Sequence, residues 1–204
     1  AFRARGLSAY GPTRKAAAIE GSKVFSKNLM HKYGIPTAEY RVFTDAEEAR
    51  RYVRAKGAPL VLKAEGLAAG KGVIVALTEE EALDAIHTIL EEQAFGAAGE
   101  RLIIEEYLEG EEVTVLAFAD GEHVLMLAPS QDHKRAFDGD RGPNTGGMGA
   151  YSPVPALTPD TACRVEAEIL RPTVAALAAE GSPYRGVLYA GLMLTAAGPK
   201  VLEF

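Results

Sequence analysis

The distribution of hydrophobic and polar positions predicts that strands and helices alternate in the first half of the chain. Short apolar runs bounded by turn residues are typical of strands, and longer stretches with helical spacing are typical of helices. The predicted strands of this half are Tyr40–Phe43, Leu60–Leu62, Val73–Val75 and Leu102–Ile104. The predicted helices are Thr13–Tyr33, broken near Gly21 and Ser22, then Ala46–Lys56, and a third from Glu79 to about Glu92.

Capping signals support these helix boundaries. Thr44–Glu47 and Thr78–Glu81 both match a capping box, in which a threonine and a glutamate satisfy the free N–H groups of the first turn. Gly34 followed by Pro36 is a stop signal for the first helix. These elements together predict a compact α+β unit that ends with the strand Leu102–Ile104.

The second half of the chain predicts a strand hairpin, an irregular segment, a long helix and another hairpin. Asp120-Gly121 is a hairpin turn signal. Thr158 followed by Pro159 opens a helix that Pro172 should kink or split and Gly181 should end. The predicted elements are strands Val113–Ala119 and Val124–Ala128, a helix from Thr158 to about Glu180, and strands Val187–Leu194 and Lys200–Phe204.

Residues 130–153 lack any periodicity and read SQDHKRAFDGDRGPNTGGMGAYSP. Loops of this length are uncommon unless they are functional or disordered. The stretch mixes acids, bases, amides and glycines, so we predict a substrate-binding loop. His133 has no second histidine at ligand spacing, so it does not indicate a metal site.

The composition is that of an ordinary globular protein with room for one large or two small domains. The chain has 204 residues, 48% of them apolar, and a net charge of −6. Without a long basic run, binding to bulk nucleic acid or to a membrane surface is not expected. A single cysteine, Cys163, fits a reducing compartment, and its place in a predicted helix favours a small buried residue over a nucleophile. We therefore expect a cytoplasmic protein, and a fragment of a longer one, because the sequence stops inside the predicted strand that ends at Phe204.

The most informative stretch is Pro59–Leu77, which predicts a hairpin that holds an anion. An apolar run delivers Lys63, a loop of small residues from Gly66 to Gly72 contains Lys71, and a β-branched run follows. Glycines let backbone N–H groups approach phosphate closely, and the lysines add charge. The loop has neither the hydroxyl residue of a Walker A motif nor the spacing of a dinucleotide fingerprint. An ordinary flexible hairpin is the alternative.

Charged residues elsewhere give weaker signals. Lys23 begins the second helical piece beside Ser22; it could be a solvated surface charge, but a lysine at the positive end of a helix favours an anionic partner. Five acids between Glu105 and Glu112 flank a short connection between apolar strands, which suits a hinge between lobes, although such clusters are more often simply solvated. Glu203 has apolar neighbours on both sides in the last predicted strand, which suggests a placed carboxylate.

Three longer strings point to one family: residues 63–73 (KAEGLAAGKGV), 130–135 (SQDHKR) and 142–153 (GPNTGGMGAYSP). With the lysine hairpin and the terminal Glu203, they make the chain resemble the ATP-grasp superfamily and, within it, the glycinamide ribonucleotide synthetase (phosphoribosylamine–glycine ligase) family. The resemblance implies an α+β ATP-grasp fold with two α+β lobes that clamp a nucleotide. The implied parts are a linker and helical part at 1–38, a small lobe with the glycine-rich loop at 39–107, and a truncated large lobe with the substrate loop and metal site at 108–204.

The resemblance also implies site residues. Lysines and the glycine loop would hold the ATP phosphates, hinge residues the adenine, one acid the ribose, and Glu203 a Mg²⁺ or Mn²⁺ ion. The implied ATP-binding residues are Lys23, Lys63, Gly66, Gly70, Lys71, Gly72, Glu105, Glu106, Tyr107, Leu108 and Glu112. The implied catalytic residues are Lys63, Asp132 and Arg135, and the substrate-loop candidates are Asp132, Lys134, Arg135, Asn144, Gly147 and Met148.

The reaction implied by the resemblance joins glycine to 5-phosphoribosylamine in purine biosynthesis. The glycine carboxylate attacks the γ-phosphate of ATP to give glycyl phosphate, and the amine nitrogen then displaces phosphate. Such chemistry needs positioning and charge neutralisation more than a protein nucleophile. The implied partners are these small molecules, with no nucleic acid and no membrane, and the implied state is a monomer or weak homo-oligomer.

Some family features are missing from this sequence. No carboxylate lies near Gly191, where the superfamily often has a further metal ligand, and the family's asparagine ligand, R-F-G-D-P-E stretch and N-terminal domain would fall outside residues 1–204. The alternatives are therefore another carboxylate–amine ligase of the superfamily, a non-catalytic ATP-binding module, or an interaction domain that binds no phosphate.

Overall fold

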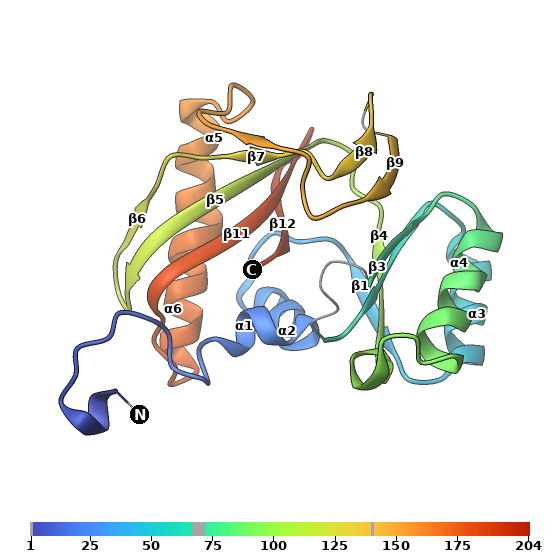
Figure 1. The fold of residues 1–204 in the computed structure, drawn as a ribbon, viewed down its shortest axis with the longest axis horizontal. Helices are drawn as coiled ribbons and strands as arrows, with labels where there is room; N and C mark the ends of the chain where they lie inside the picture. Colours follow the sequence, from blue (N-terminus) through green and yellow to red (C-terminus); the bar gives the residue numbers. More distant parts are fainter. Residues whose placement is uncertain (1, 67–71, 140) are drawn as a thin grey trace.

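A computed structural model describes residues 2–66, 72–139 and 141–204 and shows an α+β fold with two lobes (Figure 1). We call residues 40–106 the small lobe, and α1, α2 and the elements from β5 to β12 the large lobe. The described residues contain two four-stranded sheets, one in each lobe, and two two-stranded sheets. Each lobe has its own hydrophobic core. None of the helices in the described part of the chain has the length and apolar character needed to span a membrane.

The small lobe is an antiparallel sheet with strand order β1-β4-β2-β3, and two helices cover one of its faces (Figure 1). Alternation along the strands places Leu62 and Ile104 in the core under the helices, so Lys63 and Glu105 belong to the opposite face. The elements are β1 (Tyr40–Phe43), α3 (Ala46–Lys56), β2 (Leu60–Ala64), β3 (Val73–Ala76), α4 (Glu79–Ile86), a π-helical turn (His87–Glu91), a 3₁₀ helix (Gly96–Gly99) and β4 (Leu102–Glu106).

Capping explains where the two small-lobe helices begin. At α4 the predicted capping box is present, because Thr78 accepts from the N–H of Glu81 while the Glu81 side chain accepts from the N–H of Thr78. At α3 the predicted box is wrong: Asp45, and not Thr44, is the N-cap, and it accepts from the N–H of Glu48. Asp45 has the extended backbone that the position requires, and aspartate is as good an N-cap as any residue.

The large lobe is built on the sheet order β12-β11-β5-β6, with a long helix packed against it (Figure 1). The helices α1 and α2 join the same core through Ile19, Leu29 and Met30. The elements are a 3₁₀ helix (Arg3–Arg5), α1 (Ala18–Gly21), α2 (Lys23–Tyr33), β5 (Glu111–Asp120), β6 (Val124–Met126), α5 (Pro159–Arg164), a π-helical stretch (Val165–Leu170), α6 (Arg171–Ala179), β11 (Arg185–Thr195) and β12 (Gly198–Glu203).

Pro172 interrupts the long helix as predicted. It lies in the first turn of α6, immediately after the π-helical stretch Val165–Leu170. Proline has no N–H to donate, so a register change beside it avoids the loss of an α-helical hydrogen bond. The helix α6 ends at Ala179, and Gly181 follows the C-cap Glu180 with a φ of 69° that is readily adopted only by glycine.

Two expectations from the sequence need correction. Residues 130–153 are not wholly irregular, since β7 (Gln131–Asp132) pairs with β10 (Ala150–Tyr151) and β8 (Arg135–Phe137) pairs with β9 (Arg141–Asn144). Strands of two to four residues are too short to show a period. Cys163 does lie in a helix, but it is exposed, because it occupies the outer side of α5 and not the side that faces the core.

Candidate functional site

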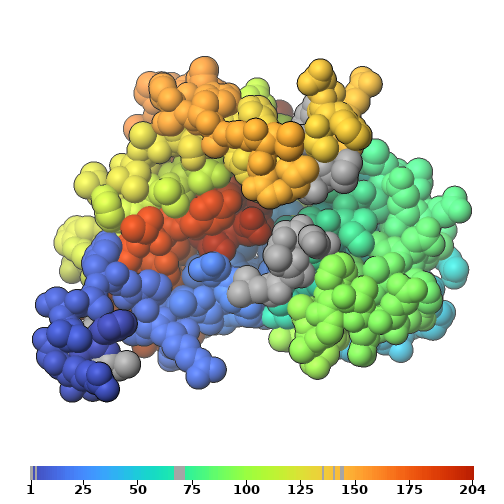
Figure 2. Space-filling model, in the orientation of Figure 1, coloured from blue at the N-terminus to red at the C-terminus, as the bar shows by residue number. Residues whose placement is uncertain are grey.

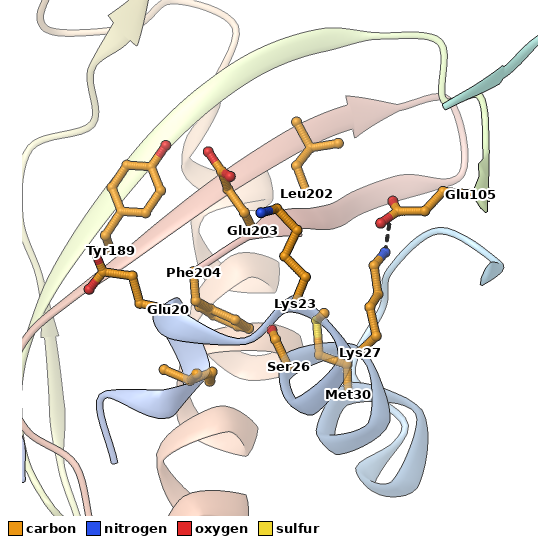
Figure 3. Close-up of a pocket in the computed structure, with 11 residues that line it drawn as sticks. Glu20, Lys23, Ser26, Lys27, Met30, Glu105, Tyr189, Leu202, Glu203 and Phe204 are labelled. Carbon is orange, nitrogen blue, oxygen red and sulfur yellow. Dashed lines mark ion pairs between the residues drawn. The ribbon is translucent and has the colours of Figure 1, made fainter. Parts of the chain in front are cut away.

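A cavity of about 310 Å³ lies where the small lobe meets the large lobe. Helices α1 and α2 form one wall, Tyr189 of β11 and the end of β12 form another, and Glu105 reaches in from β4 (Figure 3). In the space-filling view, β11 and β12 (red) lie between the N-terminal helices (blue) and the yellow-orange segment around residues 145–151 (Figure 2). This arrangement gathers residues from distant parts of the sequence around one space.

Lys23 stands at the first position of α2 and lines this cavity. Ser22 is the N-cap, and its side chain accepts from the N–H of Phe25. The Lys23 Nζ donates to the carbonyl oxygen of Gly66 at 2.9 Å and points toward the Glu203 carboxylate (Figure 3). Burial lowers the pKa of Lys23, and the negative charge of Glu203 partly opposes this effect. Lys23 is therefore a half-buried cation that forms no ion pair with any carboxylate in the described part of the chain.

The base of the glycine loop is attached to the start of α2 through Glu65. Its carboxylate accepts from the Ser22 hydroxyl and, at 2.9 Å, from the N–H of Val24, and it pairs with Arg101 at 3.3 Å. Glu65 thus satisfies N-terminal N–H groups of a large-lobe helix from the end of a small-lobe strand. The next residue must be small, because a Cβ on Gly66 would lie 2.8 Å from the Cβ of Ala98.

The deepest part of the site is a buried network around Glu105. Its Oε2 atom accepts from Lys27 Nζ at 2.9 Å and from Lys63 Nζ at 3.1 Å, and all three side chains are at most 8% exposed. Lys63 also donates to the carbonyl oxygen of Leu202 at 3.2 Å, which ties β2 to β12. Burial lowers the pKa of Lys27 to about 8, although the Glu105 charge opposes this shift. Glu203 lines the cavity with Lys23, and Lys63 contacts two residues that line it, Glu105 and Leu202.

Two polar atoms in this site have no hydrogen-bond partner within residues 2–66, 72–139 and 141–204. They are the Oε1 atom of Glu105 and the hydroxyl of Ser26, and both residues are nearly fully buried and line the cavity. A buried polar atom without a partner costs about 1–3 kcal/mol. These atoms are consistent with a site that receives hydrogen-bond donors from a ligand.

A smaller cavity of about 20 Å³ continues the site toward the substrate-loop residues. Glu203 and Tyr189 line both cavities, and Asp132, Lys134 and Glu112 line the smaller one. Burial raises the pKa of the Tyr189 hydroxyl, and Glu203 adds to that effect. Burial opposes the charge of Lys134, but Glu112 at 3.7 Å and other nearby acidic groups outweigh it and raise the pKa of Lys134.

The predicted hinge is the connection between the two main sheets. β4 ends at Glu106 and β5 begins at Glu111. Glu106 pairs with Lys200 at 2.6 Å and accepts from the N–H of Glu39, while Tyr107 is exposed and Leu108 is buried. A cavity of about 430 Å³ lies beside the hinge, and residues 106–109, Lys56 and Lys200 are among those that line it.

The remaining predicted residues are placed as follows. A Cβ on Gly147 would lie 2.8 Å from Asp132 Oδ1, so those two predicted residues are neighbours, while Met148 is exposed. The backbones of Arg135 and Asn144 pair across β8 and β9. Gly72 accepts from the N–H of Ala64 at 2.8 Å, and Gly70 and Lys71 lie outside the described residues.

The sequence interpretation missed four residues of this site: Ser26, Lys27, Glu65 and Tyr189. Helical spacing could have found Lys27, because it lies four residues after Lys23 and shares its face of α2. Glu65 could not have been found in the same way, because its partners come from another lobe.

The chain is similar to proteins of one family along its whole length. A sequence model described as phosphoribosylglycinamide synthetase, ATP-grasp (A) domain, matches residues 21–204. Relatives named phosphoribosylamine–glycine ligase from Yersinia pestis and Escherichia coli (strain K12) are 58% identical to it, and each alignment covers 100% of this chain and 48% of the relative. The chain spans about half the length of the curated relatives it matches.

Solved structures give the same fold. The phosphoribosylamine–glycine ligase of Thermotoga maritima has a TM-score of 0.86 at 41% identity, over 95% of this chain and 49% of that one. The D-alanyl-alanine synthetase A of Vibrio cholerae has a TM-score of 0.74 at 18% identity, over 99% of this chain and 60% of that one. The second comparison supports the fold alone.

Proposed function

The chain belongs to the phosphoribosylglycinamide synthetase ATP-grasp (A) domain family, and from this membership we propose that it provides the ATP-binding part of a phosphoribosylamine–glycine ligase. The ligase joins glycine to 5-phosphoribosylamine with ATP and gives glycinamide ribonucleotide, ADP and phosphate. Purine biosynthesis of this kind and the single cysteine are both compatible with a cytoplasmic enzyme that acts on small molecules.

One observation supports the nucleotide role most strongly. Lys23 and Glu203 line the same cavity, and Lys63 of the small lobe contacts two more of its lining residues, Glu105 and Leu202. In the proposed complex the two lysines hold the phosphates of ATP. The hinge from Glu105 to Leu108 contacts the adenine, with the free Oε1 of Glu105 as a candidate acceptor. Glu112 accepts from the ribose hydroxyls.

Glu203 is the proposed ligand of a divalent cation, Mg²⁺ or Mn²⁺. Among the residues that the structure describes, no group of three or more histidine, cysteine or acidic side chains could hold a metal ion. One carboxylate from Glu203 still fits, because Mg²⁺ is commonly held by one or two carboxylates together with substrate phosphates. When bound, such an ion would neutralise charge on the transferring phosphoryl group.

The proposed acceptor side of the site is the smaller cavity and the substrate loop. Asp132 and Lys134 line the smaller cavity together with Glu203, and glycine or the amine would be positioned there. Gly147 lies next to Asp132, and Met148 follows it in the loop. Arg135 and Asn144 belong to the same loop and remain candidates. In this proposal the side chains bind, orient and neutralise charge, and closure over the site keeps water from the glycyl phosphate.

The proposal is tested by assaying the full-length protein with ATP, glycine, 5-phosphoribosylamine and Mg²⁺. We expect equal amounts of ADP and glycinamide ribonucleotide, detected by mass spectrometry. Replacing glycine with D-alanine or 5-phosphoribosylamine with ammonia is expected to give no stoichiometric product. ATP binding without any amide product would favour a non-catalytic module, and turnover of other amino acids would favour another ligase.

A further inference from the structure

Lys27 has no role in the function proposed above, yet it lies at the centre of the site. It projects from α2 and pairs with Glu105 of β4 (Figure 3). The same Glu105 oxygen also accepts from Lys63, so two ammonium groups share one carboxylate oxygen. The side chains of Lys27 and Glu105 are 3% and 2% exposed, so water screens this arrangement very little.

The two lysines are anchored on opposite sides of the shared carboxylate. Lys27 donates to the Thr37 hydroxyl at 2.8 Å, and Thr37 in turn donates to the carbonyl oxygen of Val201, so Lys27 is fixed to the large lobe. Lys63 extends from β2 of the small lobe and donates to the carbonyl oxygen of Leu202. The two lysines are held by separate elements of the fold, but the Glu105 carboxylate is the negative charge that both ammonium groups share.

The charge of this network does not balance. One carboxylate neutralises one ammonium group, so two lysines and one glutamate leave one positive charge in a buried place, which is unfavourable unless an anion completes the site. If Lys27 were absent, Glu105 and Lys63 would form a neutral pair, and the carboxylate would compete with a phosphate for Lys63. The presence of Lys27 removes that competition.

We propose that Lys27 is a positioning residue that engages Glu105 and thereby leaves the charge of Lys63 available to a phosphate group. This inference rests on the proposed nucleotide site. Lys27 itself does not touch the phosphate in this arrangement. If the buried pair had a purely structural role, removal of the Lys27 charge, alone or together with the Glu105 charge, would cause no specific change in phosphate affinity.

The test uses the full-length protein and titration calorimetry with two probes, ATP and inorganic tripolyphosphate, because the second lacks the base that Glu105 would contact. Lys27→Met keeps the length of the side chain and removes its charge. We expect it to weaken tripolyphosphate binding about 10-fold or more, since coupling between close charges at binding sites reaches this size. Lys15→Met, at an exposed lysine that donates to the carbonyl of Glu180, is the matched control and should change neither affinity.

Rescue distinguishes the inference from a structural role. The double variant Lys27→Met/Glu105→Gln again leaves Lys63 with an unpaired charge, so tripolyphosphate affinity should return to within about threefold of wild type. Lys27→Arg keeps the charge and should bind about as well as wild type. Equal affinity of Lys27→Met and wild type, or failure of the double variant to recover when it is folded by circular dichroism, would overturn the inference.

Folding and function are separated by the same set of variants. If Lys27→Met does not fold, Lys27→Arg and the double variant are compared with wild type. The inference requires both of these variants to bind tripolyphosphate, so loss of binding in either one would overturn it. If wild type itself binds neither ATP nor tripolyphosphate, the proposed function fails first. The inference about Lys27 fails alone when wild type binds and the loss and rescue are not seen.

The pH dependence gives a second readout. Lys27 faces Glu105 and Glu106 of β4, Lys63 of β2 and the ring of Tyr40 in β1. Burial lowers the pKa of Lys27 to about 8, so its charge is lost as the pH rises through that value. ATP affinity of wild type should therefore fall between pH 7 and pH 9 more than that of Lys27→Arg, which stays charged. Identical profiles for wild type and Lys27→Arg would contradict the inference.

Discussion

The two ends of the site differ in how completely the protein satisfies its own charges. At the closed end, Lys27 and Lys63 meet Glu105 at 2.9 and 3.1 Å, and all three side chains are buried. At the open end, Lys134 and Glu112 are 3.7 Å apart and 38% and 50% exposed, and the Glu203 carboxylate makes no hydrogen bond or ion pair with other described residues. The closed end is therefore fixed by the fold, whereas the open end leaves its charges for ligands.

This difference sets what mutations should do. Charges in a buried place interact strongly and are costly to leave alone, whereas half-exposed charges are screened and tolerate change. Changes at the closed end should affect nucleotide binding and stability together. Changes at the open end should affect binding or turnover with little effect on folding.

The largest expected effect is that of Lys63→Ala at the closed end. The variant removes a proposed phosphate contact and leaves Lys27 as the one ion-pair partner of Glu105 among the described residues, so ATP affinity should fall about 100-fold, within the range for truncating a buried charged partner. Calorimetric titration with ATP measures this, and Lys15→Ala is the control. Unchanged affinity and turnover in a folded variant would remove Lys63 from the site.

Glu203→Gln is the corresponding change at the open end. If Glu203 holds the divalent cation, ligase turnover should fall about 10- to 100-fold, while the free energy of unfolding should change by less than about 0.5 kcal/mol. Turnover at varied Mg²⁺ concentration and urea unfolding measure the two quantities. Glu100→Gln, at an exposed glutamate of the small lobe, is the control. A large loss of stability with normal turnover would place Glu203 in the folded framework and not at the metal.

Glu65→Ala tests the connection between the two lobes, because Glu65 joins the base of the glycine loop to the start of α2. Removing its carboxylate leaves the N–H of Val24 without its acceptor, so we expect a loss of about 2 kcal/mol of stability and a raised KM for ATP. Asp45→Ala removes an N-cap from α3 away from the site, and it should cost about 1 kcal/mol without changing the KM. If both variants raised the KM for ATP equally, the effect would come from the loss of helix capping and not from the position of Glu65 in the site.

A pH dependence of stability is also expected at the closed end. The pKa of Lys27 is about 8 in the folded protein, against an ordinary lysine value of 10.5, so the unfolded chain binds more protons between these values. Stability contributed by this residue should rise with pH across that window, by at most about 1.4 kcal/mol per pH unit. The difference between wild type and Lys27→Met in urea unfolding at pH 8 and pH 10 measures it. A difference that falls over this range would contradict the assignment.

The comparison also shows what the sequence could predict. Lys23, Lys63 and Glu203 lie at the ends of helices or strands, where local patterns place them, and their positions follow from elements that the hydrophobic periodicity predicts. The ion pair of Lys27 with Glu105 and the hydrogen bond of Glu65 with Val24 each join residues more than 35 positions apart in the sequence. Lys27 and Glu65 are buried because the two lobes pack together.

The errors have similar causes. The helix at Ala46 was predicted, but the choice between Thr44 and Asp45 as N-cap depends on backbone angles that composition does not show. The exposure of Cys163 depends on the rotational phase of a short helix whose other face packs on the core.

Hydrogen–deuterium exchange with and without MgATP tests the central claim that both ends bind one nucleotide. The claim predicts that the start of α2 at residues 22–27, the end of β2 at residues 63–66 and the end of β12 at residues 201–203 become protected together at the same ATP concentration. Protection of only one of these segments, or of none, would contradict it.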